Sequence, residues 1–367
     1  MKGKYKGKKL VKYIEKIPSS KKYFRFLKPK PIKKKLYSNY LIKSIFLLLF
    51  FFVYFIFRKI GDKIKKYINK DDYLIEKQLS NNYVNNSFII ISYVCESCGL
   101  FSHYNRLLSC TASIVKDGRI PIANFIRFKN IFNRFNESSL TLDQNPWEYF
   151  FKQPFGYTLK DVKKYAKHQR NYECTAYPRP SQDIIFYNKF YKYYWNNIYK
   201  TYFPIKDEII QEAEKVMKKL FKKSENVLGI FVRGTDFLAL RPRNHAIQPE
   251  PEVVMNDVDK FEQENHYDYY FLSTEDDIIR NKFINRYKDK LKYFKANHSF
   301  RYNNTKVLAY NEDVNGNLEF MKVYLINTVI VSKCIDIICG RTNGSVFIFI
   351  ITKGFRNIKV YNYGKYT

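Results

Sequence analysis

The sequence predicts an α/β protein in which a parallel β-sheet is covered by helices on both faces. Two observations support this fold class. From residue 87 onward, short apolar runs are separated by amphipathic stretches, which is the pattern of layered strands and helices. In residues 206–367, predicted strands and helices alternate throughout, and parallel strands require such crossover connections. The chain of 367 residues is long enough for two domains.

The C-terminal region gives the clearest succession of elements. Apolar runs predict strands over residues 226–232, 267–273, 291–294, 335–339 and 358–361. The stretches beside them predict helices over residues 207–223, 252–264, 276–287, 318–333 and 344–352. In a doubly wound sheet, ligands bind beyond the carboxyl ends of the strands. The residues that follow each strand are therefore the first place to look for chemistry.

The N-terminal half of the globular region is less regular. A strand is predicted over residues 87–93, a helix over 102–116 and a second strand over 120–125. Residues 126–205 are aromatic, rich in Asn and interrupted by prolines, so we expect irregular structure there. We expect an N-terminal α/β domain over residues 83–205 and a C-terminal domain over 206–367.

The beginning of the chain differs sharply in composition from the rest. Residues 1–40 form a basic arm, residues 41–57 are almost entirely apolar, and residues 58–82 form a charged stalk. The apolar segment spans about 25 Å as a helix, close to the thickness of a bilayer core. We expect a membrane anchor, either spanning or lying in the interface. The richer positive flank favours an N-terminus in the cytoplasm.

The net charge of +31 raises the question of nucleic-acid binding. Much of this charge lies in residues 1–70, which contain 22 Lys and Arg but only two acidic residues. No finger, helix or stacking motif accompanies it, so no specific nucleic-acid partner is expected. Six cysteines are too few for a disulfide scaffold, and the pair Cys95 and Cys98 lacks the further ligands of a zinc site. Two ordinary thiols are the simplest interpretation of that pair, with a redox role as the alternative.

Polar clusters follow three of the predicted strands. They occupy residues 233–236 (Arg-Gly-Thr-Asp), 274–277 (Thr-Glu-Asp-Asp) and 340–345 (Gly-Arg-Thr-Asn-Gly-Ser). An arginine can chelate phosphate oxygens, and a helix start rich in Gly and Ser offers backbone N–H groups and the positive end of the helix dipole. The first and third clusters together predict a site for the phosphates of a nucleotide.

Other nucleotide signatures are absent from the sequence. It contains neither a phosphate loop of the form GxxxxGK[ST] nor a GxGxxG dinucleotide motif. One Asp-x-Asp pattern occurs at Asp257 and Asp259, but it lies inside a predicted helix, where residues two apart face different directions. We interpret it as a solvated helix surface and predict no metal ligands.

These clusters resemble motifs of the fucosyltransferase superfamily, which includes the α-1,6- and protein O-fucosyltransferases. Residues 231–236 (Phe-Val-Arg-Gly-Thr-Asp) are similar to its His-Val-Arg-Arg-Thr-Asp-like motif, and residues 272–276 (Leu-Ser-Thr-Glu-Asp) to its Leu-Ala-Thr-Asp-Asp-like strand end. Residues 341–345 resemble its phosphate-binding helix start, and Arg301-Tyr302 resembles another short element. Residues 98–106 occupy the place of its N-terminal Gly-rich loop. The resemblance implies two Rossmann-like halves of the GT-B type.

The resemblance also implies an activity. A donor such as GDP-fucose would bind the C-terminal half, and a glycan or protein acceptor would contact the N-terminal half. Arg233 would neutralise the departing β-phosphate, Ser345 and nearby amides would hold other oxygens, and attack would be inverting and independent of metal. No cofactor is expected beyond the nucleotide-sugar co-substrate.

The resemblance implies roles for particular residues. The donor-binding candidates are Arg233, Thr235, His245, Thr274, Asp276, Asp336, Arg341, Thr342, Asn343, Gly344 and Ser345. The acceptor or cleft-loop candidates are Gly99, His103, Asn105 and Arg106. Besides Arg233, the catalytic candidates are His103, Asp236 and Glu275, any of which could be the general base.

Two departures from the family pattern keep alternatives open. Gly234 stands where the family has a second arginine, and Phe231 stands where it has a histidine. The chain could therefore be a transferase for a different nucleotide-sugar on the same fold. It could also be a non-catalytic, membrane-anchored protein that binds carbohydrate. In any of these cases, the basic arm could tether the protein to a membrane or a nucleic acid.

Overall fold

The computed structural model describes residues 88–92, 98–116, 118–126, 144–163, 179–222, 224–234, 237, 240–295 and 314–367. They belong to one compact unit that covers residues 86–367, and the expected division near residue 205 stays a prediction. The basic arm, the apolar segment 41–57 and the stalk lie outside the described residues. Within the described ranges, no helix is both long and apolar enough to cross a membrane.

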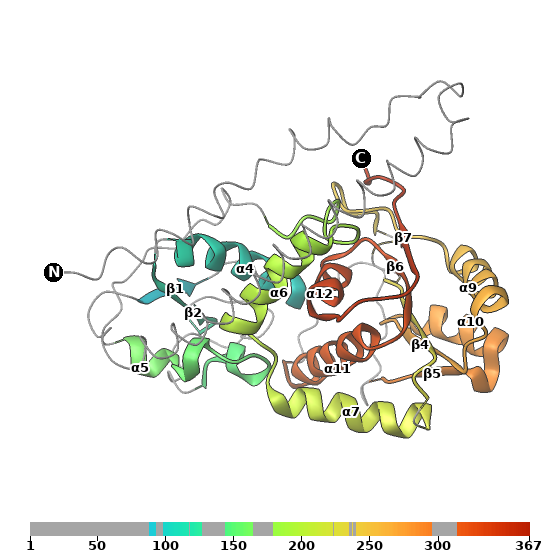
Figure 1. Cartoon of the computed structure of the whole chain (residues 1–367), viewed down its shortest axis with the longest axis horizontal. Helices are drawn as coiled ribbons and strands as arrows, with labels where there is room; N and C mark the ends of the chain where they lie inside the picture. Colours follow the sequence, from blue (N-terminus) through green and yellow to red (C-terminus); the bar gives the residue numbers. More distant parts are fainter. Residues whose placement is uncertain are drawn as a thin grey trace, which may run out of the picture. The chain divides into compact units, whose positions relative to one another are not determined.

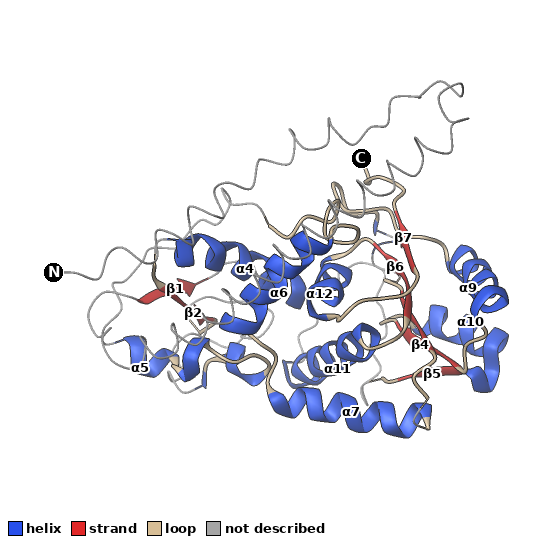
Figure 2. Cartoon of the chain, viewed as in Figure 1, coloured by secondary structure: helices blue, strands red, loops and turns tan. Residues whose placement is uncertain are grey.

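A five-stranded parallel sheet forms the C-terminal part of this unit (Figures 1 and 2). Its strands are β3 (Val227–Phe231), β4 (Tyr269–Ser273), β5 (Leu291–Tyr293), β6 (Asp336–Gly340) and β7 (Ile358–Tyr361). They lie in the order β5-β4-β3-β6-β7, and every neighbouring pair is parallel. The predicted strands and their direction are confirmed. This order is that of a Rossmann-like sheet, with its topological switch point between β3 and β6.

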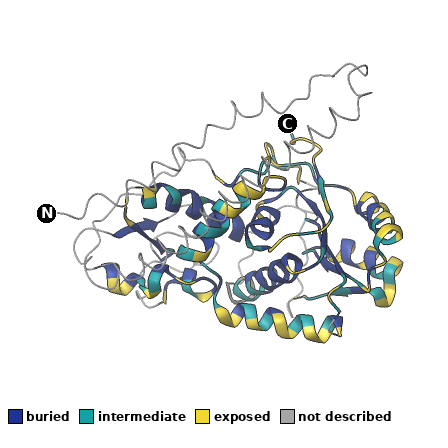
Figure 3. Cartoon of the chain, in the orientation of Figure 1, coloured by how far each residue is buried: buried dark blue, intermediate teal, exposed yellow. Residues whose placement is uncertain are grey.

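Helices cover both faces of this sheet. They are α7 (Asp207–Phe221), α9 (Pro251–Asn265), α10 (Asp277–Tyr287), α11 (Val314–Ser332) and α12 (Asn343–Ile351). Side chains of β3 alternate between two cores: Val227 and Phe231 pack in the core with α7, α11 and α12, whereas Leu228 and Ile230 pack in the core with α9 and α10. The period of two explains why these runs are uniformly apolar: both faces of the sheet are buried (Figure 3).

Gly229 allows one of these helices to approach the sheet closely. A Cβ built on Gly229 would lie 3.2 Å from side-chain atoms of Val331 and Cys334. Val331 belongs to the last turn of α11, and Cys334 follows this helix. A larger side chain in the middle of β3 would push that helix away. The glycine thus helps to set the spacing between β3 and the helical layer.

The N-terminal part contains a smaller parallel pair. Strands β1 (Phe88–Ser92) and β2 (Ile120–Asn124) pair in register and are joined by α4 (Leu100–Lys116). These three elements were predicted, except that the helix begins two residues earlier than expected. Residues 126–205 are more regular than predicted. The described parts contain η3 (Pro146–Tyr149), η4 (Pro154–Gly156), α5 (Leu159–Lys163) and the 14-residue α6 (Lys189–Tyr202).

Helix α6 forms because of its tertiary contacts. Asn188 caps it by accepting a hydrogen bond from Tyr191 N at 2.9 Å. Trp195 and Tyr199 bury their rings in the same core as α12 and α4. Aromatic residues have only moderate helix propensity, so the sequence pattern alone did not reveal this helix.

The cysteines also differ from expectation. Cys98 and Cys110 are each disulfide-bonded, so the interpretation of Cys98 as an ordinary thiol is wrong. Cys334 and Cys339 are free and buried, and burial raises the pKa of both thiols well above the usual value. They behave as small apolar core residues.

Candidate functional site

The switch point of the sheet brings two arginines to one edge. Arg233 lies two residues after the end of β3, and Arg341 follows the end of β6 directly. The two strands are neighbours, with Phe231 opposite Cys339 in register, so their carboxyl ends lie side by side. The prediction that the first and third polar clusters share one edge of the sheet is confirmed. We call this region the carboxyl edge.

Arg233 is held between a ring and a carboxylate. Its guanidinium carbon lies 4.4 Å from the ring centroid of Phe237, and its Nε lies 3.6 Å from Glu275 Oε1. Its side chain remains 23% exposed, so the guanidinium is oriented yet reachable from solvent. Glu275 also accepts a hydrogen bond from the Gly234 amide at 2.9 Å. Glu275 therefore ties the end of β3 to the end of β4 and orients Arg233.

Gly234 is required by close packing against the next strand end. A Cβ at this position would lie 2.4 Å from Asp276 Cβ, a distance that real atoms do not tolerate. Asp276 is buried and caps α10 by accepting from Ile278 N at 2.7 Å and Ile279 N at 3.2 Å. Thr274 Oγ1 in turn accepts from the Asp276 amide.

The structure gives Asp276 a capping role, and its contact with the donor stays a prediction. One of its carboxylate oxygens is occupied by the helix start, and its side chain packs against Gly234. An acidic residue after a strand more often caps the next helix, and this is what the geometry requires here. Thr274 belongs to the same local turn.

The start of α12 provides a second positive feature of the carboxyl edge. Thr342 and Ser345 form a capping box: Ser345 N donates to Thr342 Oγ1 at 3.0 Å, and Thr342 N donates to Ser345 Oγ at 2.9 Å. Ser345 is fully buried and its hydroxyl donates to the Thr342 carbonyl at 2.9 Å, so its contact with phosphate stays a prediction. The amides of Asn343 and Gly344 stand before the first intrahelical bonds, where a helix binds anions.

The start of α12 rests directly on the end of β3. A Cβ on Gly344 would lie 2.7 Å from the ring of Phe231 and 2.6 Å from Tyr324 Oη. Phe231 is buried and stacks on the ring of Tyr324. The aromatic residue that replaces the family's histidine is thus a packing residue. It fixes the helix start beside Arg233.

Arg341 is more constrained than expected. One of its terminal nitrogens donates to Asn362 Oδ1 at 2.5 Å, and the other forms an ion pair with Asp183. Its carbonyl accepts from Gln248 Nε2 at 3.2 Å. Arg341 therefore joins the turn before α6, the segment after β7 and the loop before α9. Its charge is already partly neutralised.

Of the candidates in the N-terminal part, Asn105 contacts the carboxyl edge. Asn105 Nδ2 on α4 donates to Asn343 Oδ1 at 3.1 Å and lies 3.4 Å from the Asn343 carbonyl. Gly99, before α4, is exposed, and Arg106 is half-buried. The structure thus brings Asn105 to the start of α12.

His103 does not lie where it was expected. It is inside α4 and only 1% exposed, with its ring edge-on to Phe125 at 5.4 Å. The expectation of a residue on a cleft-facing loop is wrong, because α4 begins before His103 and turns it into the core. A base must reach its substrate, and a fully buried ring does not.

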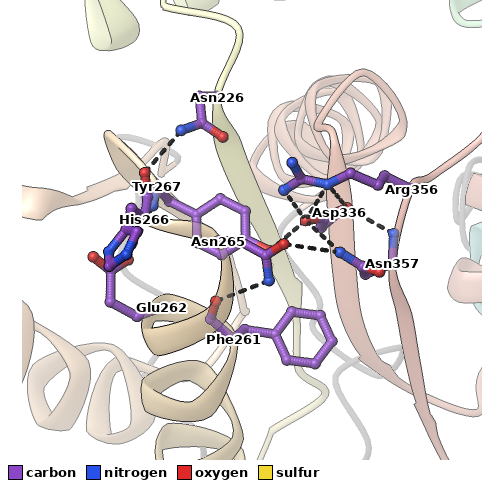
Figure 4. Close-up of polar contacts among 9 residues, drawn as sticks. All are labelled: Asn226, Phe261, Glu262, Asn265, His266, Tyr267, Asp336, Arg356 and Asn357. Atoms are coloured by element: carbon purple, nitrogen blue, oxygen red, sulfur yellow. Dashed lines mark hydrogen bonds and ion pairs between the residues drawn. The ribbon is translucent and has the colours of Figure 1, made fainter.

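Asp336 lies at the opposite edge of the sheet, at the amino end of its strand, and Figure 4 shows its polar contacts. It is the first residue of β6, five residues before Arg341, and it is 0% exposed. Its carboxylate accepts hydrogen bonds from Arg356, Asn357 and Tyr267. The expectation that it contacts a nucleobase is wrong, because the strand begins there and its length separates Asp336 from the carboxyl edge.

The remaining predicted residues divide into two groups. His245 lies near the carboxyl edge, with its ring edge-on to Phe237 at 5.3 Å. Thr235, Asp236, Arg301 and Tyr302 lie outside the described residues.

The Asp-x-Asp pair lies on α9, as predicted. Asp257 is buried and accepts from Tyr361 Oη at 2.9 Å, whereas Asp259 accepts from Tyr287 Oη and pairs with Arg286. The expectation of a solvated surface is wrong for Asp257. The two carboxylates face different partners, as two helix positions two residues apart must.

Two residues of the edge were missed in the sequence. Phe237 packs against Arg233, and Gln248 is buried and bonds the carbonyls of Ala246 and Arg341. The helical rule that residues four apart are neighbours does not apply to this pair, because Arg233 lies in the loop after β3. Nothing in the sequence marks Gln248, because its partners are backbone carbonyls distant in the chain.

Comparison with known proteins adds the following. No protein-family profile matches the sequence, and no curated protein is significantly similar to it. Among solved structures, it is similar to NodZ α-1,6-fucosyltransferase soaked with GDP-fucose, with 11% identity over 73% of this chain and 93% of that chain and a TM-score of 0.44. It is also similar to fucosyltransferase NodZ from Bradyrhizobium, with 10% identity over 73% of this chain and 94% of that chain and a TM-score of 0.43. A third similar structure is POFUT1 in complex with GDP-fucose, with 10% identity over 77% of this chain and 99% of that chain and a TM-score of 0.39.

Proposed function

We propose that this protein is a glycosyltransferase that uses a nucleoside diphosphate sugar, with GDP-fucose as the favoured donor and a glycan or protein hydroxyl as the acceptor. The observation that carries the proposal is the arrangement of Arg233 and the start of α12 on neighbouring strand ends of a parallel sheet. That position is where doubly wound sheets bind nucleotides. The motif resemblance of residues 231–236 and 341–345 supports the same conclusion.

In this proposal, Arg233 acts on the leaving group. As the bond between the sugar and the β-phosphate breaks, negative charge grows on the phosphate oxygen. An oriented guanidinium and the Asn343 and Gly344 amides would stabilise that charge. Glu275 positions Arg233 through the 3.6 Å ion pair. These groups would supply the positive charge that a divalent cation supplies in other transferases.

The acceptor hydroxyl would attack from the opposite side of the sugar and invert its configuration. Asp236, three residues after Arg233 in the sequence, is our candidate for the base that receives the hydroxyl proton. Glu275 is less suited to this role because its carboxylate already bonds Arg233 and the Gly234 amide. The acceptor side of the site would begin at Gly99, Asn105 and Arg106.

The protein is proposed to be bound to a membrane through residues 41–57, with its N-terminus in the cytoplasm. The disulfide-bonded Cys98 and Cys110 support a catalytic part on the opposite, oxidising side, because disulfides are rare in the cytosol. No specific nucleic-acid partner and no cofactor besides the co-substrate are proposed.

The test is release of nucleotide from a panel of nucleotide-sugars. The purified full-length protein is incubated with GDP-fucose, GDP-mannose, UDP-glucose and a CMP-sugar, each with and without EDTA. With water as the acceptor in place of a glycan or protein hydroxyl, we expect GDP release from GDP-fucose that survives EDTA. This release should be lost in Arg233→Ala but not in Lys219→Ala, an exposed residue of α7. Nucleotide release from UDP-sugars alone would show that the donor is a UDP-sugar. Loss of nucleotide release in the presence of EDTA would overturn the metal-free mechanism.

One observation favours a second candidate, a non-catalytic relative that binds carbohydrate. Position 234 has no room for the second arginine of the family motif, which removes one positive charge from the site. A protein that binds GDP but releases none from any nucleotide-sugar, with any acceptor tried, would support this candidate.

A further inference from the structure

The loop before α9, residues 240–248, carries two exposed arginines at the carboxyl edge. We call it the arginine loop. Arg241 and Arg243 are both exposed, and neither forms an ion pair with any residue that the structure describes. This distinguishes them from Arg233 and Arg341, which pair with Glu275 and Asp183.

The arginine loop is fastened to both arginines of the candidate site. His245 packs edge-on against Phe237 at 5.3 Å, and Phe237 packs against the Arg233 guanidinium at 4.4 Å. At its other end, buried Gln248 donates from Nε2 to the Arg341 carbonyl at 3.2 Å. The loop therefore lies across the ends of β3 and β6, beside the start of α12.

The shape of the loop is fixed by the last residues of the chain. Asn244 N donates to Tyr366 O at 2.9 Å, and Tyr366 N donates to His245 O at 2.9 Å. Ala246 forms an antiparallel bridge with Lys365. Arg241 and Asn244 have positive φ angles of 43° and 64°, a conformation that costs free energy for side-chain-bearing residues. The backbone of the loop is thus held in a defined place, from which Arg241 and Arg243 extend.

The charges of the site explain why further cations are needed. A nucleoside diphosphate carries about two to three negative charges near neutral pH. Glu275 and Asp183 partly neutralise Arg233 and Arg341, and position 234 is closed to any side chain. The first amides of α12 contribute only partial charges.

We propose that Arg241 and Arg243 bind the diphosphate group of the donor and replace the cation that Gly234 excludes. This inference rests on the proposed function, since it assigns a ligand to the same site. Guanidinium groups suit the task because they form paired, charge-assisted hydrogen bonds to phosphate oxygens. The loop thereby selects a diphosphate over a monophosphate.

The test compares GDP with GMP. Affinities are measured by calorimetry for the full-length wild type, Arg241→Gln, Arg243→Gln, the double variant and the control Lys219→Gln. We expect the double variant to bind GDP about 30-fold more weakly and GMP only slightly more weakly. The double Lys variant, which keeps the charges, should recover part of the loss, and Lys219→Gln should bind as the wild type does.

The outcomes separate this inference from the proposed function. If the wild type binds GDP and the double Gln variant binds it equally well, the arginine loop does not bind the diphosphate, although the site stands. If the affinities of the double Gln variant for GDP and GMP fall by the same factor, the arginines do not bind the second phosphate, and the inference is wrong. If the wild type binds no nucleoside diphosphate, the proposed function itself fails.

Discussion

The two edges of the five-stranded sheet handle charge in opposite ways. At the amino edge, fully buried Asp336 accepts hydrogen bonds from Arg356, Tyr267 and Asn357 (Figure 4). At the carboxyl edge, Arg233 pairs with Glu275 and its side chain remains 23% exposed. The arginines of the 240–248 loop have no ion pair with described residues at all. A charge whose partners are all internal stabilises the fold, whereas a charge left reachable can bind a ligand.

The pKa of Asp336 shows how complete its internal pairing is. Burial by itself would raise the pKa of this carboxyl. Hydrogen bonds from Arg356, Tyr267 and Asn357 outweigh that effect and lower the pKa below its usual value of 3.8. The folded protein thus favours the ionised carboxylate. Because the groups that stabilise this charge belong to the protein itself, the amino edge contributes to stability.

The largest effect is expected from Arg233→Ala. Removing the guanidinium should lower the rate of sugar transfer by about 1000-fold, or about 4 kcal/mol, because the charge on the departing phosphate loses its main partner. The melting temperature without ligand should change little, since Arg233 is partly exposed. Rates and melting curves of the same preparation check both statements. If Arg233→Ala transferred sugar at the wild-type rate, the carboxyl edge would have no part in the mechanism.

Asp336→Asn should produce the converse result. It leaves the Arg356 guanidinium and Tyr267 without their ionised partner, which we expect to cost about 3 kcal/mol of unfolding free energy. Once folded, the variant should bind nucleotide as the wild type does. Urea denaturation and nucleotide titration measure the two properties. A selective loss of nucleotide affinity, with stability unchanged, would reverse our assignment of the two edges.

The same residue predicts a pH dependence. Because the folded-state pKa of Asp336 is lowered, its contribution to stability is fully present above pH 3.8 and is lost as the pH falls through the folded-state pKa. The difference in unfolding free energy between wild type and Asp336→Asn should therefore shrink below about pH 4. A difference that stays constant down to pH 2 would contradict the lowered pKa.

Gly234→Ala sharpens the comparison at the carboxyl edge. Its Cβ would lie 2.4 Å from Asp276 Cβ, so the end of β3 must shift away from the cap of α10. We expect a loss of about 2 kcal/mol in stability, together with weaker nucleotide binding as Arg233 moves. Gly99→Ala is the matched control, because no atom lies within 4 Å of a Cβ there. Equal stability of the two variants would show that position 234 tolerates a side chain.

The smallest effect is expected from Asn105→Ala. It removes the hydrogen bonds that join α4 to Asn343 at the start of α12, at a cost of about 1 kcal/mol. Because Asn343 begins the helix whose first amides are proposed to bind the phosphates, nucleotide affinity should fall by a few-fold. Thr111→Ala, which removes a hydrogen bond within α4 alone, is a control that should leave nucleotide affinity unchanged.

The sheet could be predicted from the sequence because both of its faces are buried. Its strands are continuous apolar runs, and the glycines and polar residues after them mark where each strand ends. Neighbouring positions for Arg233 and Arg341 follow from the parallel, doubly wound pattern. The direction of each strand and the location of the site at the carboxyl edge were therefore within reach.

Sequence reasoning missed structural roles of two kinds: some residues have partners distant in the chain, and others cap the start of a helix. Asp336 precedes a strand end in sequence, but its partners Arg356 and Tyr267 come from two other segments. Ser345 and Asp276 are polar residues at helix starts, and the side chains of both accept hydrogen bonds from backbone amides there. The buried residues Trp195, Ile198 and Tyr199 of α6 do follow the helical spacing, but the aromatic and Asn-rich composition of residues 126–205 obscured it.

The central claim is that the carboxyl edge binds a nucleoside diphosphate. The most direct measurement is the melting temperature of the full-length protein with GDP, UDP, CMP and ADP, with and without EDTA, for the wild type, Arg233→Ala and Asp336→Asn. A ligand that binds only the folded state raises the melting temperature by mass action. We expect GDP to raise it in the wild type and in Asp336→Asn but not in Arg233→Ala, whether or not EDTA is present. No shift with any nucleotide, or a shift that persists in Arg233→Ala, would contradict the claim.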